Sequence, residues 1–498
     1  YIDELIRSIK LILGERNIHA PLMMVKGDGS LISAETALAR PVETILSGPA
    51  ASVMGAAQLQ PHQNAIIADM GGTTTDIAVI TDGLPVISAK ATVIGAWRPM
   101  VEAVRVFSLG LGGDSEVRFQ GGAGLAIGPR RVVPMSLLVY RYPEVLGTLE
   151  RRMNSTISPR SNRFAVALFA ETSQRKSFSP EEATAWERLQ EGPLDVELLS
   201  QKDRSLTRAL ARLVRDGIAI YSGFTPTDAA HVLGKADHWS VRAAEIAAVT
   251  WAKQMRQIYG WGKFQEHDPK GPSAAVEEHM VHTICAALVS ACLATDPGET
   301  HHAERERTAR LFSDWISGKS AVDGGLFSLK LDAARSLVAV GAPAKLYYPR
   351  VAQNFNVPLS VPQYSSVANA IGAVASSVIQ RAQVTVTQPV QGIFRVFAPD
   401  GPVDFNDLEQ ALVKAGDLAG QIAHDKAQTA GASELRIDIE RDLDSVDDPD
   451  SASVVFFEGR VKATATGRPA LTPGSGEAGL PNGTTGVKSR ASQASDAG

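Results

Sequence analysis

The segment from Asp69 to Asp76 holds the side chains best suited to chemistry, in the order Asp-Met-Gly-Gly-Thr-Thr-Thr-Asp. Gly71 and Gly72 let the backbone turn sharply and bring N–H groups close to an anion. The threonine hydroxyls add hydrogen-bond donors, and the carboxylates of Asp69 and Asp76 can hold a hydrated Mg²⁺ ion. The segment therefore suits phosphate and metal binding, although an ordinary hairpin with a polar tip explains the same residues.

Short apolar runs flank this turn on both sides, and together with it they cover residues 64–80. Apolar runs of this length that are bounded by glycines are typical of strands. The pattern predicts two strands joined by an enlarged, hydroxyl-rich tip.

Residues 69–76 resemble the second phosphate loop of the hydantoinase/oxoprolinase family, in its A-type subunits of the hydantoinase A, N-methylhydantoinase and acetophenone carboxylase kind. Residues 40–51, Arg-Pro-Val-Glu-Thr-Ile-Leu-Ser-Gly-Pro-Ala-Ala, resemble the stretch before that loop. The resemblance implies an α/β fold with an actin-like ATPase (ribonuclease H-like) domain that binds ATP and Mg²⁺. It implies that Asp69 and Thr73 are catalytic, that Asp69 is the metal ligand, and that the cofactor is bound by Gly71, Gly72, Thr73 and Thr74.

A second glycine-rich segment, residues 108–115, reads Ser-Leu-Gly-Leu-Gly-Gly-Asp-Ser. It resembles a family loop that ends in Gly-Ser, which implies that Gly112 and Gly113 also contact the cofactor. Asp114 stands where relatives usually have glycine, and a carboxylate that faces a phosphate repels it unless a metal intervenes. Three interpretations stay open: Asp114 points away, it helps to hold the ion, or this site is altered.

Residues 336–380 alternate strand, helix, strand and helix, which is the α/β pattern, and the last helix is expected over residues 366–380, where small residues predominate. This section resembles the nucleotide-base subdomain of the actin-like fold, where Gly-Gly-Ala precedes the first helix. The chain has Val340-Gly341-Ala342-Pro343 there, one glycine short. The resemblance implies that Gly341 contacts the cofactor.

Thr225-Pro226-Thr227-Asp228 is a helix start, with a cap, a proline at the first helical position and an acid at the third. It also resembles a family segment that borders the cleft, with His231 at a variable position. We favour the capping role. Ser33 is likewise expected to cap a short helix that ends at Leu38. The histidines lack metal-ligand spacing on a face shared with a carboxylate, so we interpret them as structural.

Composition excludes several classes of protein. The chain has 498 residues and a formal net charge of −5, which gives no electrostatic footprint for nucleic acid. It has no window of 18 consecutive apolar residues, so we expect no membrane span and no membrane partner. Cys285 and Cys292 lie seven residues apart in a predicted helix, too far to bridge, and indicate buried thiols in a reducing, cytoplasmic setting.

We expect five regions along the chain. They are the phosphate-loop half of the ATPase domain (1–140), a mainly helical segment (141–330), the nucleotide-base subdomain (331–380), a small α+β C-terminal domain (381–465) and a disordered tail (466–498). Helical periodicity begins at Ile2, and relatives carry about one subdomain before this point, so we interpret the chain as a fragment or a truncated gene product.

Three functions compete. The first is an ATP-dependent hydrolase subunit of the hydantoinase/oxoprolinase type, which phosphorylates a cyclic amide (hydantoin, oxoproline or lactam) or a related carbonyl and works with a B-type partner subunit. The second is a sugar-kinase-like phosphotransferase, and the third is a non-catalytic, actin-like nucleotide-binding protein. The paired loop segments favour the first, although one fold hosts many chemistries.

Two expectations concern geometry. The tip of residues 64–80 should face a cleft whose opposite wall is formed by residues 336–380. With the leading subdomain missing, the sheet beside residues 65–80 should have an unpaired edge, and apolar residues of the helix at 2–13 should be partly exposed.

Overall fold

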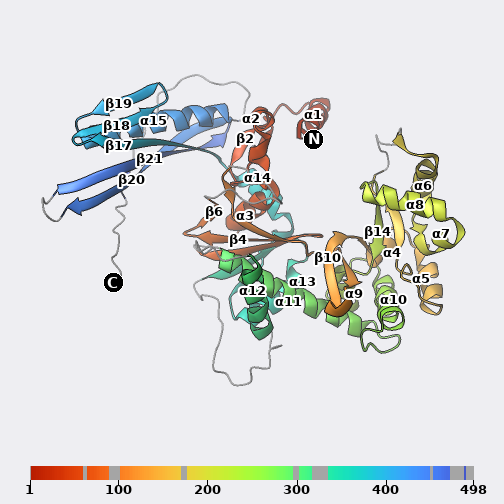
Figure 1. Cartoon of the computed structure of the whole chain (residues 1–498). Helices are drawn as coiled ribbons and strands as arrows, with labels where there is room; N and C mark the ends of the chain where they lie inside the picture. Colours follow the sequence, from red (N-terminus) through yellow and green to blue (C-terminus); the bar gives the residue numbers. More distant parts are fainter. Residues whose placement is uncertain are drawn as a thin grey trace. The chain divides into compact units, whose positions relative to one another are not determined.

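The computed structural model describes residues 2–59, 64–88, 101–169, 177–294, 302–316, 335–448, 453–470 and 487–489. The chain forms two compact units, each assembled from segments that are distant in sequence (Figure 1). Unit 1 comprises residues 1–58, 87–104 and 369–498, and unit 2 comprises residues 59–86 and 105–368. The fold is mixed α/β, as expected.

The central sheet of unit 2 contains the predicted hairpin. Strands β3 (Ala65–Met70) and β4 (Thr75–Thr81) pair antiparallel, with Met70 opposite Thr75. The strand order is β16-β15-β3-β4-β5, and β8 also pairs with β4. The remaining strands are β5 (Leu84–Pro85), β8 (Val106–Leu109), β15 (Ser336–Val340) and β16 (Leu359–Ser360).

Two geometric expectations were wrong at this sheet. Residues 336–340 do not form an opposite wall, because β15 is hydrogen-bonded in parallel directly beside β3. The hairpin also has no unpaired edge: β3 lies between β15 and β4, and the outer side of β4 is covered by β8 and β5.

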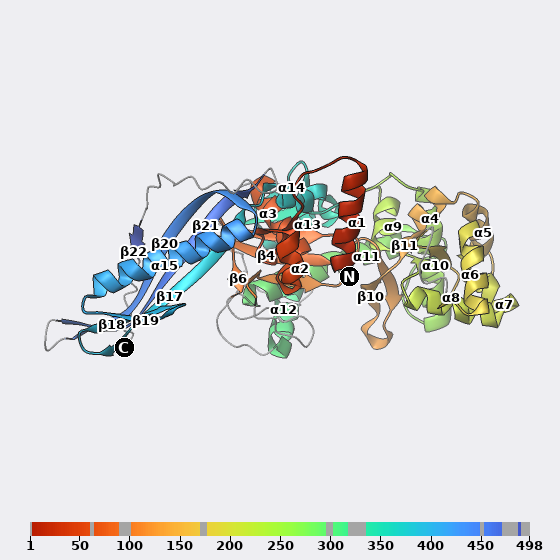
Figure 2. The same cartoon turned by 90° about the horizontal axis from the view of Figure 1, so that it is seen from above.

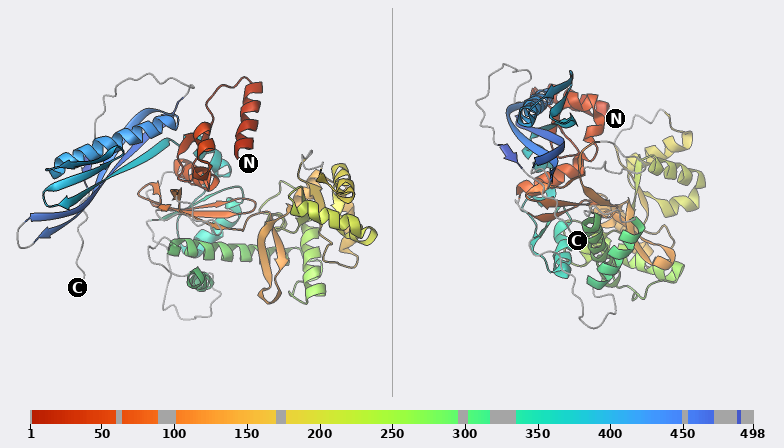
Figure 3. Two further views of the ribbon diagram at one scale, coloured as in Figure 1. Left: turned by 45° about the horizontal axis from the view of Figure 1, so that its top comes forward. Right: turned by 60° about the vertical axis from the view of Figure 1, so that its left-hand side comes forward.

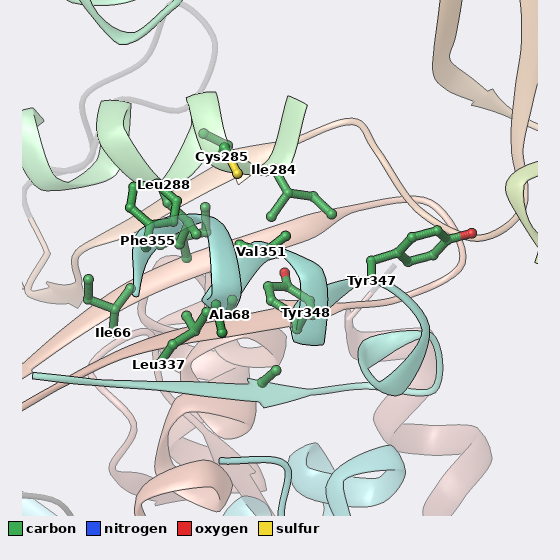
Figure 4. Close-up of a cluster of buried hydrophobic side chains, with 14 of the residues drawn as sticks. Ile66, Ala68, Ile284, Cys285, Leu288, Leu337, Tyr347, Tyr348, Val351 and Phe355 are labelled. Atoms are coloured by element: carbon green, nitrogen blue, oxygen red, sulfur yellow. The ribbon is translucent and has the colours of Figure 1, made fainter. Parts of the chain in front are cut away.

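Helices cover one face of the central sheet (Figure 3). They are α11 (Lys270–Ala294), α12 (His302–Ile316) and α13 (Ala344–Phe355). Side chains of Ile66, Leu337, Leu288 and Phe355 meet in the core between them (Figure 4). Because side chains alternate along a strand, Asp69 lies on the face of β3 opposite Ile66.

The rest of unit 2 contains a second sheet among helices. Its order is β11-β14-β12-β13. The strands and helices of this region are β9 (Ser115–Phe119), η2 (Gly121–Ala123), β10 (Leu125–Arg131), β11 (Val133–Pro134), α4 (Met135–Arg141), α5 (Val145–Met153), β12 (Phe164–Ala167), α6 (Pro180–Glu191), β13 (Leu194–Asp195), α7 (Val196–Lys202), α8 (Arg204–Arg215), β14 (Ala219–Gly223), α9 (Pro226–Val232) and α10 (Val241–Tyr259). The short helix η4 (Ser365–Val367) lies beside β15 of the central sheet. Strands β12 and β14 lie inside the segment predicted as mainly helical.

Unit 1 is built around a long sheet with one helix along a face. Figures 1 and 2 show α15 (Leu408–Thr429) lying over strands β17, β20 and β21. The sheet order is β19-β18-β17-β21-β20-β22. Its strands are β17 (Val378–Val390), β18 (Ile393–Ala398), β19 (Gly401–Phe405), β20 (Ala432–Asp448), β21 (Ser453–Pro469) and β22 (Val487–Ser489).

The other elements of unit 1 are short. They are α1 (Ile2–Glu15), β1 (Met23–Val25), β2 (Leu31–Ser33), α2 (Ala34–Ala39), η1 (Pro41–Thr44), α3 (Ser47–Leu59), β6 (Ile87–Ser88), β7 (Ala103–Val104) and α14 (Ala368–Ala375). Ser33 caps α2, as predicted, by accepting a hydrogen bond from the N–H of Thr36.

The C-terminal predictions were partly wrong. The helix expected over residues 366–380 spans only Ala368–Ala375, and Val378 already begins β17. β21 continues to Pro469, and β22 adds three residues to a segment expected to be disordered. Apart from residues 466–470 and 487–489, that tail lies outside the described residues.

Two apolar features of helices stand out. Leu5, Leu11 and Ile12 on α1 are 47%, 69% and 51% exposed, which confirms the partial exposure expected for this helix. Among the described residues one helix, Lys270–Leu293, is long and apolar enough to cross a membrane by length and composition, yet 56% of its apolar 18-residue window is buried inside the fold. We therefore describe α11 as a core helix.

Candidate functional site

The hairpin tip brings two carboxylates together. Asp69 and Asp76 stand directly opposite each other in the β3–β4 ladder, so both side chains lie on the same face of the sheet. The tip itself closes through the N–H of Gly71, which donates to the carbonyl of Thr74 over 2.9 Å. The turn thus fixes the carboxylate pair at the base of a glycine- and threonine-containing loop.

The environment of Asp76 suits a cation. Burial raises the pKa of the Asp76 carboxyl, the Ser108 hydroxyl counteracts this by donating to it over 2.5 Å, and the nearby negative charge of Asp69 raises the pKa further. Two carboxylates that share a site repel each other unless a proton or a positive charge lies between them. Asp69 and Asp76 can therefore hold a divalent cation in common.

The second glycine-rich segment lies against the tip of the hairpin. The N–H of Gly113 donates to the carbonyl of Gly71 over 3.1 Å, and the N–H of Asp114 donates to the carbonyl of Gly72 over 2.7 Å. A Cβ on Gly112 would lie 2.5 Å from the amide nitrogen of Thr73. Glycine at 112 is thus required by the close approach of the two loops.

A third segment, at the end of the neighbouring strand β15, reaches the same place. β15 pairs with β3 so that Val340 stands opposite Asp69, and Gly341 follows directly. A Cβ on Gly341 would lie 2.0 Å from the carbonyl oxygen of Met70 and 2.8 Å from Oδ1 of Asp69. Gly341 also has φ +91°, a conformation that favours glycine.

The start of α9 completes the cluster. The N–H and the hydroxyl of Thr227 both donate to the carbonyl of Gly113, over 2.9 and 2.8 Å. Thr225 and Asp228 form a capping box, which confirms the capping role. The segment therefore caps a helix and touches the glycine-rich loop.

Asp228 also connects two helices. Its carboxylate is fully buried and accepts hydrogen bonds from the N–H groups of Met135, Ser136 and Thr225 and from the Thr225 hydroxyl. Burial raises the pKa of Asp228, and hydrogen bonds from Ser136, Met135 and Thr225 oppose that rise. These contacts anchor the N-terminus of α9 to that of α4.

Asp114 carries the charge that the family pattern lacks. Its Oδ2 accepts a hydrogen bond from Nη2 of Arg131 over 3.1 Å. A Cβ on Gly72 would lie 2.6 Å from that same oxygen, so the carboxylate lies directly beside Gly72. Burial raises the pKa of Asp114, whereas the Arg131 guanidinium lowers it. The structure thus excludes the interpretation that Asp114 points away from the loop.

The structure brings the sequence-predicted site residues together. Three loops within unit 2 contribute Asp69, Gly71, Gly72, Thr73, Gly112, Gly113 and Gly341. Thr74 is exposed at the tip and takes part through its carbonyl. Sequence reasoning named Ser108 and Thr227 only as members of longer segments and did not name Arg131, because the contact of each is with a distant loop.

Other chemically interesting side chains do not form a second site. His231 is buried between the carbonyl of Thr227 and the N–H of Trp239, which supports a structural role. Burial raises the pKa of the Cys285 thiol to about 11, so it is not a nucleophile at neutral pH. Across the described ranges, no group of three or more His, Cys, Asp or Glu side chains has the arrangement of a metal site.

Comparisons with known proteins identify a related family. Residues 1–238 match the model described as hydantoinase/oxoprolinase. Over 122 residues the chain is 28% identical to the acetophenone carboxylase gamma subunit of Aromatoleum aromaticum, an alignment that covers 24% of this chain and 16% of that protein. The resemblance read from residues 40–51 and 69–76 is confirmed.

Two further matches come from comparison with solved structures. The nucleotide-free structure of an acetone carboxylase, from work on ATP-dependent acetone carboxylation, has a TM-score of 0.50 at 14% identity and matches 94% of this chain and 55% of its own. An ATP-dependent caprolactamase from Pseudomonas jessenii has a TM-score of 0.46 at 16% identity, with coverages of 94% and 57%. This chain therefore spans little more than half the length of either solved chain, and the acetone carboxylase likeness shows a shared fold.

Proposed function

From the family match over residues 1–238, we propose that this chain binds Mg·ATP at the three converging loops and activates a carbonyl group by phosphorylating its oxygen. The observation that carries the proposal is the close approach of Gly112 and Gly341 to the hairpin tip, where Gly341 also lies beside Asp69. At Gly112 and Gly341 a Cβ would collide with backbone of the hairpin, and at Gly72 with the Asp114 carboxylate. Such bare backbone suits the binding of phosphate groups.

Each loop has a distinct part in the proposal. Asp69, with Asp76 beside it, would hold the metal ion, and the backbone of residues 71–73 would bind the terminal phosphates, with the Thr73 hydroxyl as a further donor. Gly112 and Gly113 would support that loop by packing against its backbone. Gly341 would lie on the side of the nucleotide base, as in an actin-like ATPase. When bound, ATP supplies the phosphoryl group, and the Mg²⁺ ion neutralises the charge on its phosphates.

The chemistry asks for positioning more than for a protein nucleophile. An amide carbonyl is a poor electrophile, and phosphorylation of its oxygen makes that oxygen a good leaving group. Aligned donors and a fixed substrate supply most of the acceleration in phosphoryl transfer. Loops that are held by one another's backbones, as Gly71 and Gly113 are, meet that demand.

We propose a cyclic amide (hydantoin, oxoproline or lactam) or a related carbonyl as the substrate, a B-type subunit as the partner, and the cytoplasm as the location. A relative named as a subunit of acetophenone carboxylase and a similar structure named as an ATP-dependent acetone carboxylase support an ATP-dependent, multi-subunit setting. Neither Cys285 nor Cys292 forms a disulfide, which fits a reducing compartment.

The test compares Asp69→Asn with Thr73→Val by titration calorimetry of ATP with and without Mg²⁺. The first substitution removes the charge that holds the ion, while the second removes one neutral donor. Asp69→Asn should lose far more of the Mg²⁺-dependent affinity, because charge-assisted contacts are about twice as strong as neutral ones. Asp82→Asn is the matched control, since Asp82 is exposed at the other end of β4 with φ +52°, which asparagine accepts.

Equal, small effects of all three substitutions would mean that the loop is only a turn. Phosphate release measured with hydantoin, oxoproline, caprolactam and hexoses, in the presence of the B-type subunit, then distinguishes amide activation from sugar phosphorylation. Nucleotide-driven polymerisation without turnover would instead favour an actin-like scaffold.

A further inference from the structure

One charged pair in the site has no part in the function proposed above. The Asp114 carboxylate lies beside Gly72, inside the loop that is otherwise suited to an anion, and Arg131 holds it there. The backbone fixes Asp114 on both sides: its N–H donates to the carbonyl of Gly72 over 2.7 Å, and its carbonyl accepts from the N–H of Val132 over 3.0 Å. The position of the carboxylate is therefore built into the fold.

We propose that the Asp114–Arg131 ion pair, here called the cover, lies over the phosphate loop (residues 71–73) with the Asp114 carboxylate in the place of a phosphate. When the nucleotide binds, Arg131 leaves this carboxylate and pairs with the terminal phosphate instead. The inference rests on the proposed function, because it assumes a nucleotide at residues 71–73. It makes Asp114 a competitor of the nucleotide and Arg131 a specificity-determining residue for the polyphosphate.

Exposure of the two side chains supports an exchange of this kind. The Asp114 side chain is only 18% exposed, whereas that of Arg131 is 60% exposed and can turn toward a ligand. Because the Arg131 guanidinium is exposed, it can leave Asp114 without being desolvated, and the less exposed carboxylate is the partner that loses a contact. A guanidinium matches the geometry of a phosphate as well as that of a carboxylate, so the arginine loses no partner when a phosphate arrives.

Distances around Gly72 place both charges where they bear on the same ligand. A Cβ on Gly72 would lie 3.2 Å from Cγ of Asp114 and 3.7 Å from Nη2 of Arg131. An anion at the Gly72 backbone would therefore meet the carboxylate and the guanidinium together. Without exchange, the two like charges of carboxylate and phosphate would repel each other at close range.

The neighbouring arginine provides a matched control. Arg130 precedes Arg131 in the same strand, has a side chain that is 53% exposed, and pairs with Glu116 rather than with Asp114. The three atoms nearest to the Cβ position of Gly72 belong to Asp114 and Arg131 and not to Arg130. Arg130→Gln thus removes one positive charge from the same strand without touching the cover.

Calorimetric titration of the full chain with Mg·ATP tests the proposal. Asp114→Asn, which keeps the size of the side chain, should raise the affinity about tenfold, or 1.4 kcal/mol. Asp114→Gly should raise it at least as much, because it also removes the side chain that fills the space beside Gly72. Arg131→Gln should lower the affinity by about the same factor, and Arg130→Gln should leave it within about twofold of wild type.

The double variant Asp114→Asn/Arg131→Gln separates exchange from simple structural support. If Arg131 only restrains Asp114, the double variant should bind Mg·ATP as tightly as the Asp114→Asn variant does. If Arg131 goes on to contact the phosphate, the double variant should bind clearly more weakly than Asp114→Asn. Melting temperatures of all variants show whether a loss of affinity is a loss of fold.

Unchanged or weaker binding in both Asp114→Asn and Asp114→Gly, with intact melting, would overturn the inference and leave the proposed function standing. An absence of Mg·ATP binding in the wild-type chain and in every variant would overturn both.

Discussion

At the scale of single residues, the candidate site depends on positions where only glycine, which has no Cβ atom, fits between neighbouring loops. Gly341 is the sharpest case, since its Cβ would lie within 2.0 Å of the Met70 carbonyl oxygen and its φ is +91°. At Gly341 an alanine would destabilise the fold in two ways, through backbone strain and through the clash of its Cβ atom. A second glycine allows the two effects to be measured separately. Gly392, in the turn between β17 and β18, has φ +79° with no atom within 4 Å of its Cβ position.

Gly392→Ala should therefore cost only the strain of a left-handed alanine, about 1–2 kcal/mol. Gly341→Ala should cost a further ~1–3 kcal/mol, because the Met70 carbonyl must move, and it should weaken Mg·ATP binding because Asp69 moves with it. Thermal unfolding and ATP titration of the two variants measure these effects. Equal destabilisation by both, with unaltered ATP binding, would show that β15 does not support the site.

At the scale of secondary-structure elements, the buried carboxylate of Asp228 connects two helices through hydrogen bonds. Asp228 accepts from the N-terminus of its own helix α9 and from the first N–H groups of α4. All of these partners donate, so an amide at this position would turn one NH₂ group toward N–H donors. Replacement of Asp228 should affect α4 and α9 together, and through Thr227 also the glycine-rich loop.

Asp228→Asn should lower the free energy of unfolding by about 1–3 kcal/mol, the cost of leaving a buried polar group without its partner. Asp203→Asn is the matched control in the same unit: Asp203 caps α8 through one bond to the N–H of Leu206, and asparagine caps a helix about as well as aspartate. Urea unfolding followed by tryptophan fluorescence gives both values. A loss in Asp203→Asn as large as that in Asp228→Asn would contradict the anchoring role.

Local signals predicted the elements that local residues determine. The Ser33 cap, the Thr225–Asp228 capping box and the hairpin at residues 64–80 all follow from residues within a few positions of one another. Strands β12 and β14 were missed because strands of four and five residues between helices are too short to show a period of two. The small residues of 366–380 permitted a long helix, but the pairing of Val378 with Gly467 of β21 ended it.

At the scale of the whole molecule, what could not be predicted is which distant segments pair. The predicted site residues lie close together in the structure, yet the position expected for residues 336–340 was wrong, because nothing in their sequence specifies β3 as their neighbour. Unit 1 is likewise assembled from three separate segments of the chain. Charged contacts help to hold those segments together.

Arg381 in β17 is such a contact. Its Nη1 lies 3.3 Å from Asp28 and 3.0 Å from Glu102, so one guanidinium connects all three segments of unit 1. The Asp28 side chain is 1% exposed, and Lys26 at 3.5 Å would be its remaining cation. Loss of Arg381 would thus leave a buried carboxylate poorly compensated.

Arg381→Gln should destabilise unit 1 by about 1–3 kcal/mol and increase proteolytic cleavage within residues 1–58. The control is Arg395→Gln, since Arg395 pairs with Asp404 across an exposed part of the same sheet, where an ion pair adds little. Calorimetric melting and limited proteolysis report on each. Similar melting and cleavage patterns for the two variants would mean that the Arg381 contacts do not hold the segments together.

The parallel pairing of β15 with β3 also determines when the site can exist. Ser336 pairs with Ala65, and more than half of the chain's length separates them. Contacts so far apart form late in folding, because the entropy of closing the intervening loop must be overcome first. During synthesis the hairpin leaves the ribosome long before Gly341 does, and each nascent chain therefore passes through a stage with an exposed, incomplete site. A nucleotide that needs all three loops can stabilise only the finished fold, so it should slow unfolding and leave the rate of folding unchanged.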